Sequence, residues 1–272
     1  MMKQVTPARR NKYALDNGMK KDLETLIKIC HSNLKNSPEC IAYLRDSRGL
    51  SEAAIEKYKI GYFPQNINML TKYVSRATLE KLNIIDYSGN SKFADFYFLV
   101  FPLYNEYGEP VGINGRTLMS DTQREMIGIA KYENSSFKKS HLLFGFNHSR
   151  GAILAKNNVY ICEGNFDVIQ LQEHDIKNSV AICGTGFSKD HFVRLARYSD
   201  TFTFVLDNDD GGQTAISRIN KKFSNKGIRL RFRTLPSRFK DVDEFFSAGH
   251  TKEGFINALE QRDPDLENME WK

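Results

Sequence analysis

The stretch Val159-Tyr160-Ile161-Cys162-Glu163-Gly164-Asn165-Phe166-Asp167 decides the fold of this chain. Its first four residues form an apolar, β-type run that predicts a buried strand ending at the carboxylate of Glu163. Gly164 permits a sharp backbone turn, and Asp167 begins a segment whose apolar residues predict a helix packed back on the sheet. Because ligand sites of open α/β sheets lie at the carboxyl ends of strands, Glu163 stands where chemistry is expected.

The same order of elements recurs twice downstream. Residues 179–183 and 201–206 predict two more strands, the first ending in a glycine turn and the second in the acidic turn 207–212. A segment with helical spacing follows each strand. This alternation is typical of βαβ units, and it predicts a parallel sheet with acidic residues gathered at one edge.

The segment before the deciding stretch mixes helices with a hairpin. Apolar residues at helical spacing predict a helix at 23–34, and Ser51 is placed to cap another helix that ends near residue 58. The runs 96–104 and 110–116 flank a turn and predict two antiparallel strands. We therefore expect an α/β protein, with a mixed α+β N-terminal subdomain followed by a Rossmann-like parallel sheet with flanking helices.

Composition sets limits on the class of protein. The chain has 272 residues, 40% of them hydrophobic, and a net charge of +6, which is compatible with a nucleic-acid partner. Its four cysteines form no CxxC pair, so we expect no disulfide framework and a reducing cytoplasm. Cys30 and Cys40 are too sparse for a zinc site, and we expect no zinc in this chain. No apolar run approaches the roughly 20 residues of a membrane span, so we expect no membrane partner.

Three acidic motifs carry a resemblance to a known domain. Glu163-Gly164, followed by Asp207-Asn208-Asp209, resembles the Toprim domain that bacterial-type primases, topoisomerases and some nucleases share. Asp241-Val242-Asp243 is similar to the third acidic motif of these proteins. Taken alone, residues 207–212 have the composition of a surface turn, but the motifs on either side favour an acidic site.

A block of residues upstream of these acidic motifs narrows the choice of family. Lys131-Tyr132-Glu133-Asn134-Ser135, then Phe137 and Lys139, then Leu143-Phe144-Gly145, follow the order and spacing of the RNA polymerase core of DnaG-type primases. Toprim nucleases and topoisomerases have no reason to carry this block. The chain therefore resembles the core of a bacterial or phage DnaG-type primase over about residues 40–260, and most specifically over 94–245.

The resemblance implies a division of the chain and a reaction. The expected segments are a flexible basic lead-in at 1–22, an N-terminal α+β subdomain with a basic groove at 23–150, a Toprim catalytic domain at 151–250, and a C-terminal helix and tail at 251–272. The expected reaction is RNA primer synthesis on single-stranded DNA from ribonucleoside triphosphates. The implied partners are a replicative helicase and a separate zinc-ribbon element, in the cytoplasm of a bacterial or phage-infected cell.

A cluster of carboxylates is expected to hold Mg²⁺ or Mn²⁺, because magnesium prefers oxygen ligands. By resemblance the central catalytic acids, which also bind metal, are Glu163, Asp207 and Asp209. The metal site would be extended by Asp241, Asp243 and Asp167. Crowding is expected to raise the pKa of some of these acids when no cation is bound. Whether Glu163 is a metal ligand or a general acid or base stays open.

A set of basic and polar residues is expected to bind nucleotide and template phosphates beside the acids. By resemblance the set is Arg116, Lys131, Tyr132, Asn134, Lys139 and Arg48, with Tyr132 placed to stack a base. Arg48 fits the family pattern only with a small insertion. The alternating arginines 229, 231 and 233 fit a nucleic-acid contact and a solvated strand face equally well.

Two other functions remain as alternatives. One is a Toprim-type metal-dependent nuclease, and the block at 94–145 argues against it. The other is a non-catalytic subunit that binds nucleic acid or a helicase. Retention of all the acids argues against this second alternative.

Overall fold

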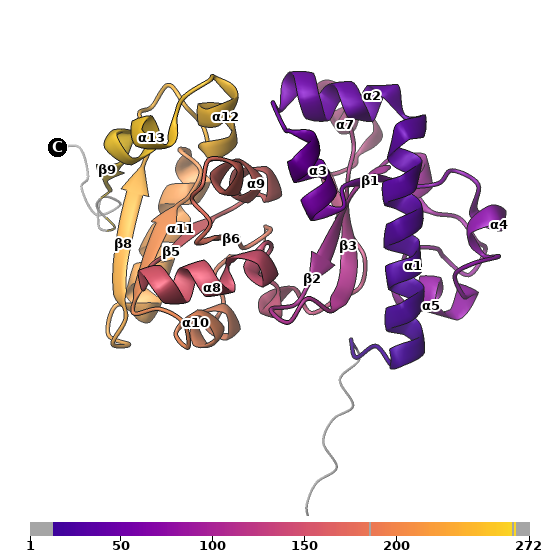
Figure 1. Ribbon diagram of the computed structural model, residues 1–272, viewed down its shortest axis with the longest axis horizontal. Coiled ribbons are helices and arrows are strands. Elements are labelled where there is room, and N and C mark those ends of the chain that lie inside the picture. The colour runs from indigo at the N-terminus through magenta and orange to yellow at the C-terminus, as the bar shows by residue number, and fades with distance from the viewer. Residues whose placement is uncertain (1–12, 185, 263, 265–272) are drawn as a thin grey trace, which may run out of the picture.

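Two β-sheets organise the chain, one in each half of the molecule in Figure 1. The computed structural model describes residues 13–184, 186–262 and 264. The first sheet is antiparallel, with strand order β1-β2-β3-β4, and the second has the order β6-β5-β7-β8-β9. This mixed α/β architecture confirms the predicted fold class.

The first half places short helices around the antiparallel sheet. Its elements are α1 Asn17–Asn33, α2 Pro38–Ala42, α3 Glu52–Tyr58, β1 Gly61–Tyr62, α4 Ile67–Leu70, α5 Arg76–Lys81, α6 Lys92–Asp95, β2 Leu99–Tyr104, β3 Pro110–Arg116, α7 Asp121–Ile127 and β4 Tyr132–Asn134. A 3₁₀ turn at Leu34–Asn36 and a π turn at Tyr43–Ser47 flank α2. The predicted hairpin is confirmed, since β2 and β3 pair antiparallel.

The second half wraps helices around the parallel sheet. Its elements are α8 Phe146–Lys156, β5 Val159–Cys162, α9 Asn165–Glu173, β6 Ser179–Ala181, α10 Lys189–Leu195, β7 Thr201–Val205, α11 Asp210–Phe223, β8 Arg229–Thr234, α12 Val242–Ser247, α13 Lys252–Ala258 and β9 Glu260–Gln261. Strands β5 to β8 are parallel, and β9 joins β8 antiparallel at the edge. A 3₁₀ turn at Lys139–His141 precedes α8.

The expected lead-in is too long. The side chain of Asp16 accepts a hydrogen bond from the Met19 N–H at 2.8 Å and caps α1 there, so the helix begins at Asn17 and not after residue 22. Residues 1–12 of the expected lead-in lie outside the described residues. The predicted apolar face of this helix is confirmed by the burial of Leu23, Leu26, Ile27 and Cys30.

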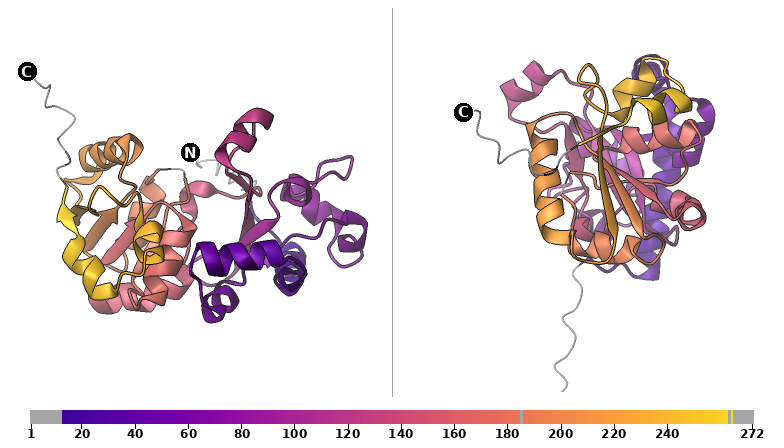
Figure 2. Two further views of the ribbon diagram at one scale, coloured as in Figure 1. Left: turned by 90° about the horizontal axis from the view of Figure 1, so that it is seen from above. Right: turned by 90° about the vertical axis from the view of Figure 1, so that its left-hand side faces the viewer.

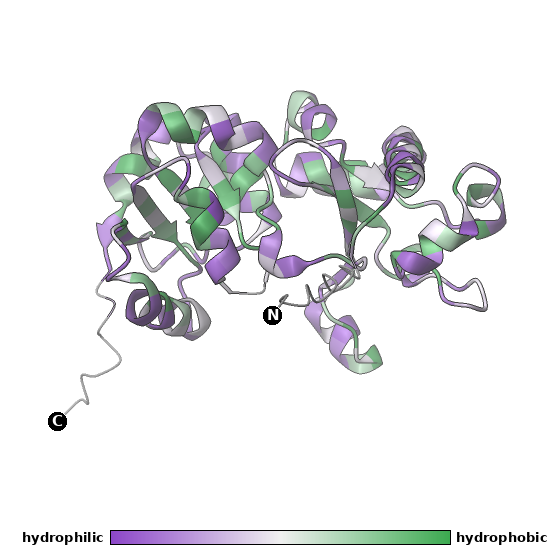
Figure 3. Cartoon of the chain, turned by 90° about the horizontal axis from the view of Figure 1, so that it is seen from below, coloured by the Kyte–Doolittle hydropathy of each residue, from purple (hydrophilic) through white to green (hydrophobic). Residues whose placement is uncertain are grey.

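Alternating side chains give the parallel sheet its two buried faces. Phe202 and Phe204 of β7 pack toward α10 and α11, where Phe223 closes the cluster. On the opposite face, Cys162 packs with Phe255 of α13 and with residues of α9 and α12. In Figure 3, hydrophobic segments run through the strands of this half of the molecule. The sheet edge that carries the acids is therefore held by apolar layers on both sides.

The two halves share a core. Phe166 and Ile169 of α9 belong to the same buried cluster as Leu44 and Phe101 of the first half. The expected boundary at residue 150 falls inside α8, whose Ile153 is buried in the core of the second half. The expected C-terminal segment also packs on that half through α13. None of the described helices is long and apolar enough to span a membrane.

His191 in α10 is a buried neutral base. Its Nδ1 accepts the Ser188 N–H at 3.3 Å, so Nε2 carries the proton and donates to the Lys139 carbonyl at 3.3 Å. Burial is the chief cause that lowers the pKa of His191 to about 4. The unfolded chain, with an ordinary histidine pKa near 6.5, therefore binds the proton more readily.

The consequence is a specific loss of stability in acid. The contribution is complete above about pH 6.5 and is lost as the pH falls toward about 4, with a decrease of about 2 kcal/mol between roughly pH 7 and pH 5. Urea unfolding at both pH values should show this extra decrease in the wild type and not in His191→Gln. Equal pH dependence in the two proteins would contradict the assignment.

Candidate active site

The two leading acids lie side by side at the carboxyl edge of the parallel sheet. Glu163 follows β5 and Asp207 follows β7, which are neighbouring strands. One carboxylate oxygen of Glu163 accepts the backbone N–H of Asp207 at 3.3 Å. The strand order thus joins two residues that are far apart in the sequence.

Asp167 ties this edge to α12. Its Oδ2 accepts the Gly164 N–H at 2.9 Å, and its Oδ1 accepts the Asp243 N–H at 3.0 Å. Asp167 is 5% exposed and Asp243 is 3% exposed. Burial, followed by the nearby Asp241 and Asp207, raises the pKa of Asp167 well above its usual range. Asp167 therefore fixes the turn between β5 and α9 while adding negative charge to the site.

Crowding of carboxylates is the main electrostatic property of this edge. Burial, then the charges of Glu163 and Asp241, raises the pKa of Asp207 to about 7. Burial and the charge of Asp209 raise the pKa of Glu163. A bound cation would relieve this repulsion, and carboxylate oxygens are the ligands that Mg²⁺ prefers.

The chemistry of the donor set therefore fits a hard divalent cation. Among residues 13–184, 186–262 and 264, no group of three or more His, Cys, Asp or Glu side chains is arranged so that it could hold a metal ion by itself. The acids form an open edge and not a cage. This is compatible with magnesium, which keeps several waters and takes one or two carboxylates together with substrate phosphates.

Two of the expected metal ligands act as helix caps. Asp209 Oδ1 accepts the Gly212 N–H at 2.9 Å at the start of α11, and Asp241 Oδ1 accepts the Glu244 N–H at 2.8 Å at the start of α12. Asp241 still lines the cavity beside the acids, whereas Asp209 does not. Asp209 acts on the site through its charge, which raises the pKa of both leading acids.

A cavity of about 480 Å³ lies between the acids and the first half of the molecule. The predicted residues that line it are Arg48, Arg116, Lys131, Tyr132, Asn134, Lys139, Glu163, Asp167, Asp207, Asp241 and Asp243. The acids come from residues 163–243, and the basic and polar groups among these residues, named the basic wall, come from residues 48–139. The structure thus brings together every predicted site residue except Asp209.

Arg116, one of the residues of the basic wall, packs against aromatic rings. The Arg116 guanidinium is 5.0 Å from the centroid of the Tyr132 ring and 5.3 Å from that of Phe166, and it donates a hydrogen bond to the Tyr132 hydroxyl. Arg116 is 6% exposed. Burial raises the pKa of Tyr132 to about 12, so its hydroxyl stays neutral. The ring that was expected to stack a base is thus in contact with Arg116.

Arg48 and Asp243 are partners of one another. They form an ion pair between the first half and α12, and Arg48 also lies 4.9 Å from the Phe166 ring centroid. Gln170 donates a hydrogen bond to the Arg48 carbonyl at 2.6 Å. In this arrangement the Arg48 guanidinium balances the charge of Asp243 and joins the two halves.

Three polar residues that line the cavity were not predicted as site residues from the sequence, namely Lys240, Asn165 and Asn114. Lys240 lines the cavity, and its charge lowers the pKa of both leading acids against the effect of burial. Asn165 donates to the Asn114 side chain at 3.0 Å, which links the two halves of the molecule. The signal for Lys240 was its position directly before the third acidic motif.

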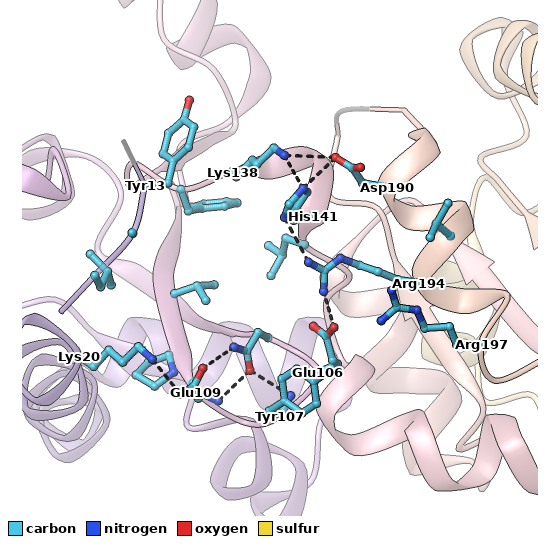
Figure 4. Close-up of a pocket in the computed structure, with 18 of the residues that line it drawn as sticks. Tyr13, Lys20, Glu106, Tyr107, Glu109, Lys138, His141, Asp190, Arg194 and Arg197 are labelled. Carbon is cyan, nitrogen blue, oxygen red and sulfur yellow. Dashed lines mark hydrogen bonds and ion pairs between the residues drawn. The ribbon is translucent and has the colours of Figure 1, made fainter. Parts of the chain in front are cut away.

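A larger cavity, of about 670 Å³, lies between the hairpin turn and α10 (Figure 4). Its three acids are all paired: Glu109 with Lys20, Asp190 with His141 and Lys138, and Glu106 with Arg194. No predicted site residue lines this cavity. It has no free carboxylate edge, so the smaller cavity is the candidate site.

Gly212 gives a test of how α11 supports Asp207. A Cβ at Gly212 would lie 2.0 Å from the Asp207 carbonyl oxygen, whereas one at Gly211 would meet only the Asp209 side chain, at 3.2 Å. We expect Gly212→Ala to lower the free energy of unfolding by about 1–3 kcal/mol and to displace Asp207. Gly211→Ala is the matched control and should change it by less than about 0.5 kcal/mol. Equal melting temperatures for both variants would contradict this packing.

Comparison with known families gives two matches along the chain. Residues 29–150 match the family described as "DNA primase catalytic core, N-terminal domain", and residues 160–246 match the one described as "Toprim-like". Together the two matches cover most of the segment that carried the resemblance in the sequence.

Relatives and solved structures give the same result. The chain is 28% identical over 262 residues to the DNA primase of Chlamydia pneumoniae, covering 92% of this chain and 43% of that protein. It is 32% identical over 243 residues to the DNA primase of Synechocystis sp., covering 82% and 37%. The chain therefore spans less than half the length of these relatives.

Two solved structures share the fold. The Aquifex aeolicus primase, with zinc-binding and RNA polymerase domains, matches with a TM-score of 0.78 at 24% identity, over 95% of this chain and 64% of that one. The RNA polymerase domain of Mycobacterium tuberculosis primase DnaG matches with a TM-score of 0.76 at 22% identity, over 92% and 84%.

Proposed function

This chain belongs to the family of DnaG-type primases with a Toprim domain, and from that membership we propose that it synthesises RNA primers on single-stranded DNA. The observation that carries the proposal is the single cavity that the carboxylate edge and the basic wall both line. Primer synthesis needs both, because a 3′-hydroxyl attacks the α-phosphorus of a nucleoside triphosphate and pyrophosphate leaves.

The acids are proposed to hold the cation. Five acids line the cavity, namely Glu163, Asp167, Asp207, Asp241 and Asp243, and of these Asp167 and Asp243 are buried. Asp209 contributes charge from the start of α11. A bound Mg²⁺ or Mn²⁺ would supply stabilisation of the charge that develops on the attacking and leaving oxygens. The raised pKa of Glu163 also suits a group that accepts or donates a proton at the reacting hydroxyl.

The basic wall is proposed to hold phosphates. Arg116, Lys131 and Lys139 line the same cavity as the acids, and Asn134 adds a neutral donor. Contacts of this kind position a nucleotide and a template strand without reading the sequence of bases. Arg116 is held by its aromatic contacts, so it can present its guanidinium without a large loss of side-chain freedom.

The groove lysines give a separate prediction. Lys131→Ala and Lys139→Ala are expected to weaken binding of single-stranded DNA severalfold at low salt, and each should reduce the salt slope of the logarithm of the binding constant by about 0.7. Lys138→Ala is the matched control, because Lys138 pairs with Asp190 outside the catalytic cavity. Titrations by fluorescence anisotropy measure both quantities. Unchanged binding at low salt in both groove variants would exclude the basic-groove assignment.

A primer assay tests the proposed function. The protein is incubated with a single-stranded DNA template, four ribonucleotides and Mg²⁺, and labelled RNA is resolved by length. Template-dependent RNA is the expected product. Cleavage of labelled DNA without RNA synthesis would support a Toprim-type nuclease, and binding without either reaction would support an accessory subunit. The match of residues 29–150 to a primase core favours synthesis.

The partners that we propose for this chain are inferred from its membership of this family. One solved relative is described as a DnaG primase catalytic domain bound to single-stranded DNA, and another contains a zinc-binding domain. We propose that this chain also binds a single-stranded template and works with a zinc-ribbon element and a replicative helicase in the cytoplasm. The four cysteines are free thiols, which agrees with a reducing compartment.

A further inference from the structure

We propose that the outer face of β8 binds the phosphate backbone of single-stranded DNA through Arg229, Arg231 and Arg233, outside the catalytic cavity. These three residues are named the arginine stripe. None of them lines the cavity beside the acids. The inference goes beyond primer synthesis, because a strand can bind to the stripe whether or not a nucleotide is added.

The register of β8 places the arginines on one face. Phe232 is buried and stacks on Phe204 of β7 at 5.5 Å between ring centroids, so it points to the α11 side of the sheet. Residues at alternate positions of a strand share a face and are about 6.6 Å apart. The three arginines therefore form a straight row on the opposite face, at a spacing that suits successive phosphates of an extended strand.

The stripe is open to solvent. Arg229 and Arg231 are exposed and Arg233 is half-buried. β9 pairs only with the last two residues of β8, opposite Arg233 and Thr234. In Figure 1, β8 lies at the left edge of the molecule with α13 above it, and the right-hand view of Figure 2 shows this side from the front. A strand of nucleic acid can therefore approach along the length of the row.

The three guanidinium groups keep their charge available. Among the described residues, no carboxylate forms an ion pair with any of the three arginines. By contrast, Arg48, Arg76, Arg124 and Arg194 all have carboxylate partners. Burial raises the pKa of Tyr160, and Arg231 and Arg233 oppose that rise, which places both on the Tyr160 side of the sheet.

The chemistry of the surface favours a polyanion over a protein partner. Protein interfaces have an apolar or aromatic centre, but no large exposed hydrophobic residue of the described chain lies on β7 or β8. The β7 residues opposite the three arginines are Thr201, Thr203 and the buried Val205. Guanidinium groups bind phosphate through paired hydrogen bonds, so a row of them fits a phosphodiester backbone.

The end of the stripe is connected to the catalytic edge. β8 leads into the loop 235–241, which carries Arg238 and then Lys240 at the cavity. The Asn208 N–H donates to the Lys240 carbonyl at 2.7 Å, and the Thr234 hydroxyl donates to the Asn208 side chain at 3.1 Å. A template strand that passes Lys240 can therefore continue along the stripe, which lengthens the DNA footprint.

The test compares short and long oligothymidylates by fluorescence anisotropy over a salt series. The variant R229Q/R231Q/R233Q removes the charges, and R229K/R231K/R233K keeps them. The matched control K28Q/K35Q/K72Q removes the same charge from exposed positions in the first half of the molecule. Unfolding curves check that each variant is folded.

We expect the glutamine variant to bind the long oligonucleotide roughly tenfold more weakly, with a salt slope smaller by about 2. Its binding of an oligonucleotide that fills only the cavity should be unchanged, as should extension of a short primed template. The lysine variant should retain most of the affinity, and the control should behave as wild type. Wild-type affinity and slope in the glutamine variant, or an equal loss in the control, would overturn the proposal. If the wild type makes no primers but the glutamine variant still shows the weaker binding and the smaller salt slope, only the proposed function is contradicted.

Discussion

Glu163→Gln and Asp207→Asn are each expected to abolish primer synthesis while single-stranded DNA still binds with nearly wild-type affinity. Each variant keeps the shape of the side chain and removes one negative charge from the edge that would hold the cation. Metal-dependent charge stabilisation supplies several kcal/mol at the transition state, so the loss of rate should reach about 10³-fold or more. DNA affinity depends on the basic wall, which neither substitution touches.

The same variants should be no less stable than the wild type when no divalent cation is present. Asp207 lies in a crowd of carboxylates that raises its pKa to about 7, with burial as the first cause, so Asp207→Asn removes a repulsion. Added Mg²⁺ should raise the melting temperature of the wild type and should raise that of Asp207→Asn less. This melting experiment reports on the cation site without any dependence on catalysis.

Asp210→Asn is the matched control. Asp210 is an exposed acid in the first turn of α11 and does not line the cavity. Its substitution should leave both synthesis and the Mg²⁺ response close to wild type. Full synthesis by both Glu163→Gln and Asp207→Asn would show that the acidic edge is not the catalytic site.

Local sequence patterns were sufficient to predict the strands and turns that position the acids of this site. The apolar run before Glu163 and its turn at Gly164 are decided by neighbouring residues, and the parallel sheet follows from repetition of that pattern. The edge of the sheet then gathers Glu163 and Asp207 without any further information. The antiparallel hairpin of β2 and β3 was equally predictable, because one turn fixes its pairing.

Contacts between distant residues could not be predicted in this way. Asp209 belongs to the same acidic motif as Asp207, but its carboxylate caps α11 and it does not line the cavity. Arg48 and Asp243 were expected to serve different ligands, yet they bind each other although they are 195 positions apart in the sequence. The sequence pattern around Arg48 does not predict Asp243 as its partner, because this contact depends on how the two halves of the molecule pack together.

Arg48→Ala should have the largest effect on stability among the ionic contacts of the site. The substitution leaves Asp243 buried at 3% exposure without its cation, and loss of one partner of a buried pair costs about 3–5 kcal/mol. Arg45→Ala is the matched control, because the pair of Arg45 with Glu52 is exposed and should contribute less than about 1 kcal/mol. Chemical denaturation of the two variants measures the difference.

A double-mutant cycle separates the ion pair from the other contacts of Arg48. Asp243→Asn removes the buried charge, so Arg48→Ala should cost much less in that background than in the wild type. The remaining cost should reflect the packing of Arg48 against the Tyr43 and Phe166 rings, at 5.1 Å and 4.9 Å from their centroids. Equal costs in both backgrounds would show that Arg48 stabilises the joint between the halves by packing alone, and that Asp243 is free to serve the metal.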